Sequence, residues 1–333
     1  VRSGDLTLIP SEELSCHPRN DVNMRSLALE RAKTLEKTRD VSPQAVRRSA
    51  LSIVKARADE TTPDCSTGPE FRVFTHFWQQ LLLRPENGIE LPATFVFSLD
   101  APSAAVLHFD PDGRNHLLQS GGLLADAINF TDTEHRGFGA LCVDLRGLGD
   151  SKPAVYPYEM TSWGSPDRTL SYVSAALGDS LMAMRVRDGL ASLRYLRSRP
   201  EVHPDAIVVT GRGLCGLVAL HVALIDGGCA AVVWDAPLGF KTLLEADDCR
   251  WSPEAFVPNV LLHYDLPEMA AAIDRPVSFF NPMDGTGRVL DSIAIEMLNV
   301  SAQRSIYATA DGTASISDAI RSLLKSDVKG AVD

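Results

Sequence analysis

The chain has 333 residues, of which 45% are hydrophobic and 23% charged, so it can bury a sizeable core and is not a disordered polymer. Its 32 Lys and Arg against 43 Asp and Glu give a formal net charge of -11, which disfavours nucleic acid and anionic membranes as partners. The longest apolar runs, such as 230–234, are too short to cross a bilayer, which excludes a transmembrane protein. The polar first residues show no signal-peptide pattern, and the sequence does not determine the compartment.

The first 70 residues differ in composition from the rest and predict a helical arm or cap. Charged residues are dense between 20 and 55, and leucines there recur at helical spacing. Ser42 followed by Pro43 is typical of an N-cap and a first helical position, so a second helix is expected to run to about residue 57. The segment 59–69 is polar, contains two prolines and predicts a loop. We therefore divide the chain into an arm over 1–70 and a main domain over 71–333.

The main domain alternates between predicted strands and predicted helices. Strand-like runs lie at 75–83, 94–99, 104–109, 139–145, 206–210, 230–235, 276–281 and 303–309. Helical patterns lie at 117–129, 175–197, 216–226, 291–298 and 315–324. This alternation predicts a doubly wound, mostly parallel α/β sheet of about eight strands. The first two strands have no helix between them and Gly88 in their turn, which predicts an antiparallel hairpin.

A glycine turn between a strand and a helix is the sharpest local feature, and two chemistries fit it. Gly211, Gly213 and Gly216 match G-x-G-x-x-G, and Asp235 ends the next strand, as in a dinucleotide-binding loop. The same turn resembles a G-x-S-x-G nucleophile elbow, in which Gly213 would occupy the nucleophile position and Cys215 would replace the last glycine. A structural turn that binds nothing is the third interpretation.

The place of the turn in the chain favours the elbow. A dinucleotide fingerprint usually follows the first strand of its domain, whereas most of the predicted strands here precede the turn. An α/β-hydrolase sheet places its elbow after the fifth strand, with three more strands beyond, and this chain fits that order.

Four segments carry a resemblance to a known family. The run 144–151 is similar to the D-x-R-G-x-G-x-S segment of α/β hydrolases, and 108–113 is similar to their H-x-x-G oxyanion region. The hairpin 83–93 and the segment 275–284 resemble the opening hairpin and the acid-bearing strand of acetyl-xylan-esterase-like and dienelactone-hydrolase-like proteins. The resemblance covers roughly residues 71–325 and implies an α/β-hydrolase fold with ester hydrolysis as the ancestral activity.

The catalytic triad of that family carries over only in part. The nucleophile position holds Gly213, and the acid position holds Asp284, with Asp291 as a second candidate. The family's histidine should follow the acid, but no histidine lies beyond Asp284. A serine hydrolase needs a base to take the hydroxyl proton and an acid to orient that base, so two of the three members are missing.

Other side chains are candidates to replace the missing members of the triad. Cys215 is a candidate nucleophile at a helix N-terminus, although no base is assigned to it. His108 belongs to the vestigial oxyanion region and otherwise suits a polar structural role, while His221 and His263 are expected to be structural. Arginines at 185, 187, 194 and 197 are expected on the exposed face of one long helix. The six cysteines form no C-x-x-C pair, and no metal or cofactor is expected.

These observations predict an acetyl-xylan-esterase-like unit with a degenerate triad and an accessory or binding role. Its expected ligand is a carbohydrate or a small ester, and its expected partner is an active esterase domain or a second copy of the chain. One alternative is an active carboxylic or carbohydrate ester hydrolase with an atypical site. Another alternative is a dinucleotide-binding domain that uses Gly211, Gly213 and Gly216.

Overall fold

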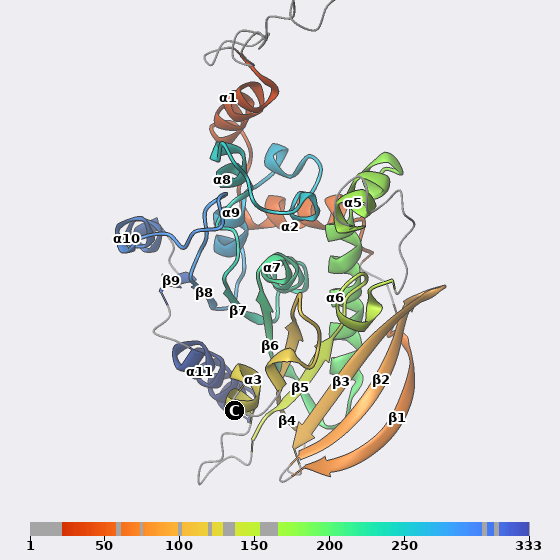
Figure 1. Ribbon diagram of the computed structural model, residues 1–333. Helices are drawn as coiled ribbons and strands as arrows, with labels where there is room; N and C mark the ends of the chain where they lie inside the picture. Colours follow the sequence, from red (N-terminus) through yellow and green to blue (C-terminus); the bar gives the residue numbers. More distant parts are fainter. Residues whose placement is uncertain are drawn as a thin grey trace, which may run out of the picture.

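A single large β-sheet runs through the computed structural model (Figure 1), which describes residues 22–57, 61–73, 76–98, 102–118, 122–128, 137–153, 166–301, 305–309 and 313–332. The sheet in these residues has nine strands in the order β1-β2-β3-β5-β4-β6-β7-β8-β9. The strands are β1 (Asp64–Val73), β2 (His76–Glu86), β3 (Ile89–Ser98), β4 (Ser103–Phe109), β5 (Gly139–Val143), β6 (Val202–Arg212), β7 (Ala230–Trp234), β8 (Val277–Phe280) and β9 (Ser305–Ala308).

Parallel and antiparallel strands occupy different parts of this sheet. Strands β5, β4, β6, β7, β8 and β9 are mutually parallel, whereas β1, β2 and β3 form an antiparallel edge attached to β5. Strands β4, β5, β7 and β8 are buried along their whole length, as expected for strands covered on both faces. The predicted mixed sheet and the predicted hairpin at Gly88 are both confirmed.

Strand β1 corrects the prediction of a loop over 59–69. Its residues are mostly exposed, and a register irregularity lies between Thr67 and Glu70, on either side of Pro69. A polar edge strand with a proline lacks the alternation of apolar and polar residues by which a strand is recognised in sequence. Backbone pairing with β2 holds this segment as a strand instead. The strand also crosses the predicted boundary at residue 70, so the arm contributes to the sheet.

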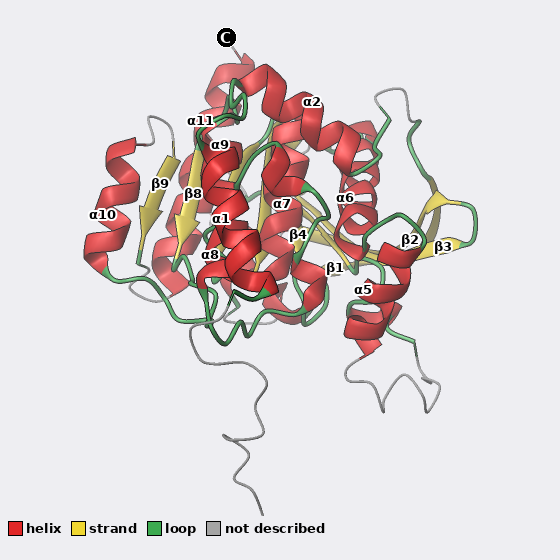
Figure 2. Ribbon diagram, turned by 90° about the horizontal axis from the view of Figure 1, so that it is seen from above, coloured by secondary structure: helices red, strands yellow, loops and turns green. Residues whose placement is uncertain are grey.

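Helices cover both faces of the sheet (Figures 1 and 2). One face carries α2 (Pro43–Ile53), α6 (Leu181–Ser198), α7 (Leu214–Asp226) and α9 (Leu266–Ala271), and the other carries α3 (Leu123–Ile128) and α11 (Thr313–Val332). The remaining helices are α1 (Met24–Glu36), α5 (Pro166–Ala176), α8 (Phe240–Glu245) and α10 (Ser292–Ser301), with 3-10 turns η1 (His116–Leu118), η2 (Gly149–Ser151), η3 (Pro253–Ala255) and η4 (Val260–Leu262). No described helix is long and apolar enough to cross a membrane.

Two predicted helices have different bounds in the structure. The predicted helix 175–197 is two helices, α5 and α6, and α6 begins where the Ser180 hydroxyl accepts a hydrogen bond from the Ala183 amide. Within the predicted helix 117–129 the described residues form η1 and the short α3. The apolar spacing that predicts a helix from residue 175 continues across the turn before Ser180, where the cap sets the start of α6 instead.

The N-terminal helix α2 packs against α7 and α9, which cover the sheet, whereas α1 packs against α8 and η4. Helix α2 begins at Pro43, as predicted, although the Ser42 hydroxyl makes no capping bond. Val46 of α2 and Val54, which follows the end of that helix, are fully buried in the same core cluster as α7. The Arg47 guanidinium donates to the Leu224 carbonyl at the end of α7. The division into an arm and a main domain stays a prediction, and residues 1–21 lie outside the described part.

Candidate functional site

The turn between β6 and α7 has the backbone conformation of an elbow. Gly213 has φ 56° and ψ -128°, and its amide donates to the Trp234 carbonyl of β7. A Cβ on Gly211 would lie 2.3 Å from the Cys215 carbonyl oxygen, so only glycine fits there. A Cβ on Gly213 would meet nothing nearer than the Asp235 carbonyl oxygen at 3.9 Å. The turn therefore has room for a side chain at its centre, where the sequence provides none.

An ionic cluster lies directly beside the turn. Arg212 donates two hydrogen bonds of 2.9 Å to the Asp110 carboxylate, and it also pairs with Asp112. Burial alone would raise the pKa of Asp110, but the nearby His108 side chain and the hydrogen bonds from Arg212 hold that pKa well below its usual value. Sequence reasoning missed this cluster, although the carboxyl ends of neighbouring parallel strands must meet at one edge of the sheet.

His108, predicted in the vestigial oxyanion region, lies in β4 and is fully buried. Its Nδ1 lies 2.8 Å from the Thr210 hydroxyl, its Nε2 lies 3.8 Å from an Asp110 carboxylate oxygen, and its ring stacks on Trp234. Burial lowers the pKa of His108, so the ring is neutral at ordinary pH. These contacts give His108 the role of a buried link between β4, β6 and β7.

Asp284, at the predicted acid position, lies in the loop after β8. One carboxylate oxygen accepts hydrogen bonds from the Thr286 amide, the Thr286 hydroxyl and the Arg288 amide. Burial acts to raise its pKa, but these hydrogen bonds outweigh it and lower the pKa. Within the described part of the chain, no histidine hydrogen-bonds to Asp284. Its carboxylate therefore stabilises its own turn.

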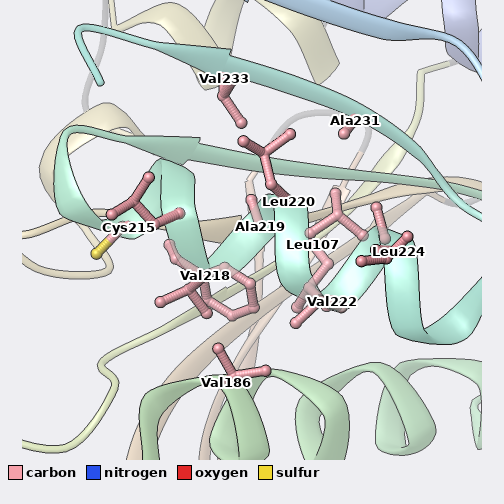
Figure 3. Close-up of a cluster of buried hydrophobic side chains, with 14 of the residues drawn as sticks. Leu107, Val186, Cys215, Val218, Ala219, Leu220, Val222, Leu224, Ala231 and Val233 are labelled. Carbon is pink, nitrogen blue, oxygen red and sulfur yellow. The ribbon is translucent and has the colours of Figure 1, made fainter. Parts of the chain in front are cut away.

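Cys215 lies on the first turn of α7, inside the core. Figure 3 shows it in the same buried cluster as Val218 of α7 and Val186 of α6. Burial raises the pKa of its thiol to about 12. A nucleophilic cysteine requires a lowered thiol pKa and access from solvent, and this environment provides the opposite.

A buried ion-pair network supports the loop 144–151. Arg185 is 1% exposed, donates to Glu254 at 2.6 Å and donates to the Arg146 carbonyl at 3.0 Å. Arg146 in turn binds the buried Asp188 carboxylate of α6. The expectation that Arg185 lies on an exposed helix face is therefore wrong. Sequence alone could not place it, because the loop and η3 that cover this part of α6 are distant in the chain.

Esterases of known structure share this architecture. A candidate acetyl xylan esterase from Bacteroides fragilis aligns with 89% of this chain and 84% of its own, at a TM-score of 0.64 and 12% identity. The acetyl xylan esterase of Paenibacillus sp. R4 aligns with 87% of this chain and 95% of its own, at a TM-score of 0.59 and 16% identity. This chain has an α/β-hydrolase fold. At such identities the likeness establishes the fold and leaves the substrate open.

The sequence comparison points in the same direction. YtaP of Bacillus subtilis strain 168, named as a candidate hydrolase, is 27% identical over 206 residues. The match spans 58% of this chain and 65% of that relative, so this chain covers slightly less than two thirds of it. No family profile matches the chain.

The turn at Gly213 has the conformation of an α/β-hydrolase nucleophile elbow, and the residue at its centre is a glycine. The hydrolase fold would present the side chain of the residue at 213 above the sheet, beside the Asp110–Arg212 pair. The turn follows the sixth strand of this sheet, because β1 is added at the edge. Asp235, which the dinucleotide interpretation needs, accepts a hydrogen bond from the Asn281 side-chain amide.

No group of three or more metal-binding side chains occurs among the described residues.

Proposed function

We propose that this chain is an esterase-like α/β-hydrolase unit that does not hydrolyse esters and acts by binding. The observation that carries the proposal is Gly213, which holds the elbow conformation, has space for a side chain and has none. The absence of any histidine after Asp284 in the sequence supports the same proposal. Without a nucleophile and a base, the acyl-transfer route of the fold has no first step.

The names of the relatives support the class of ligand in this proposal, and the partner is a proposal of its own. Two of the similar structures are acetyl xylan esterases by name, so the proposed ligand is a carbohydrate or a small ester. The proposed partner is an active esterase domain or a second copy of this chain. In such an assembly this unit would hold the carbohydrate while the partner cleaves the ester.

The experiment is an ester-hydrolysis assay on the purified chain. We expect no turnover of p-nitrophenyl acetate above that of the heat-inactivated protein. We also expect Gly213→Ser alone to remain inactive, because base catalysis contributes about 10²–10⁴-fold and no base is positioned. Turnover that co-purifies with the chain and disappears in Cys215→Ala would contradict the proposal and support the atypical esterase. Strong activity in Gly213→Ser would show that a base is present at the elbow.

A further inference from the structure

A cavity lined by cationic side chains lies away from the elbow, where the end of α2 meets β2 and α6. It has a volume of about 490 Å³. Its cationic lining consists of Lys55, Arg57, Arg187 and Arg194, and Glu86 is the carboxylate among the described residues that line it. We propose that this cavity binds a multivalent anion bearing phosphate, sulfate or carboxylate groups.

Two of the four cations have no carboxylate partner in the described part of the chain. The Lys55 amine donates to the Gly178 carbonyl. Arg57 makes no hydrogen bond or ion pair with any described residue. In a protein with a formal net charge of -11, cations gathered around one cavity repel one another, and a bound anion relieves that repulsion.

The other two arginines are fixed in place by backbone carbonyls. Arg187 donates to the Val54 carbonyl at 2.8 Å and pairs with Asp179. Arg194 donates through Nε to the Thr61 carbonyl at 3.1 Å. Fixed guanidinium groups lose little conformational entropy when they bind an anion, so this cavity is partly organised before a ligand arrives.

The acidic residue of the lining does not cancel this charge. Glu86 forms an ion pair of 2.7 Å with Arg146, which also binds Asp188. The Glu86 carboxylate is therefore already shared with a cation outside the lining.

The backbone at Lys55 is held in an uncommon conformation. Its φ is 54°, a left-handed value that a non-glycine residue adopts at a cost. Glycine would adopt the same conformation without strain, so Lys55→Gly removes the amine and leaves the backbone unstrained. This property makes the position suitable for a test.

The cationic lining of the cavity indicates the chemical class of the ligand rather than one particular molecule. Guanidinium groups bind phosphate, sulfate and carboxylate oxygens through two parallel hydrogen bonds. The cavity volume is typical of small-ligand sites. No described lining residue belongs to the turn 211–216, so this inference goes beyond the proposed function and does not depend on it.

The test is isothermal titration of the full chain at low salt with pyrophosphate, sulfate and a galacturonate trisaccharide, with neutral xylotriose as the uncharged control. We expect saturable binding of at least one anion, with an affinity that falls as NaCl is raised. In Lys55→Gly/Arg57→Gln the dissociation constant should rise tenfold or more, and each single variant should show part of that loss. Arg250→Gln removes an exposed arginine outside the cavity and should bind as the wild type does.

Three results would overturn the proposal. The first is the absence of binding by every anion. The second is an affinity that the double variant leaves unchanged although its unfolding midpoint matches that of the wild type. The third concerns Asp59 and Glu60, which follow Arg57 in the sequence and lie outside the described residues. Anion binding that appears only in Asp59→Asn/Glu60→Gln would show that the cations of the cavity form ion pairs with carboxylates of the chain itself.

Discussion

Replacing Gly213 should destabilise the protein through the backbone alone. At φ 56° and ψ -128° a non-glycine residue is strained by about 1–3 kcal/mol, while the nearest atoms to an added Cβ are 3.9 Å away and do not clash. A Gly→Ala change also lowers the entropy of the unfolded chain, which returns about 0.4–1 kcal/mol. We therefore expect Gly213→Ala to reduce the free energy of unfolding by about 1–2 kcal/mol, and Gly213→Val to reduce it further because branching at Cβ adds crowding.

The assay is urea unfolding followed by circular dichroism, with Gly88→Ala as the matched control. Gly88 has φ 79° in the hairpin turn and nothing within 4 Å of an added Cβ, so it reports backbone strain without contacts. The two alanine variants should lose similar free energies of unfolding. If Gly213→Ala were neutral or stabilising, the turn would have an ordinary negative φ, and both the elbow and the argument for a vacated hydrolase site would fail.

Three further predictions concern the surroundings of the elbow. NAD and FAD should not raise the melting temperature; a saturable rise at micromolar nucleotide that Asp235→Ala abolishes would restore the dinucleotide interpretation. Because the folded-state pKa of Asp110 is depressed, its contribution to stability is present above about pH 5 and is lost as the pH falls below about 4. Asp110→Asn, which also loses the ionised contact with Arg212, should therefore show a shallower loss of stability over that acid range in pH-dependent urea melts. Arg185→Met leaves the largely buried Glu254 without its partner and should cost about 3–5 kcal/mol of unfolding free energy, whereas Arg185→Met/Glu254→Gln should cost less. Equal costs would show that the loss in Arg185→Met does not come from leaving the Glu254 carboxylate unpaired.

Sequence alone determined the buried strands of the sheet and the position of the glycine turn at 211–216. Buried parallel strands are continuous apolar runs, and glycines at fixed spacing are required where backbone passes within 2.3 Å of where a Cβ would stand, as at Gly211. Both signals are local, so they can be recognised without knowing what packs against them. The glycine at position 213 was visible for the same reason.

Only the tertiary structure decided which charged residues lie together. Arg185 has the sequence appearance of a surface arginine, yet the loop 144–151 and η3 enclose it beside Glu254. Arg212 and Asp110 are separated by 102 positions in the chain and meet because β4 and β6 are neighbours in the sheet. Side-chain pairing depends on distant segments converging, and no local periodicity records that convergence.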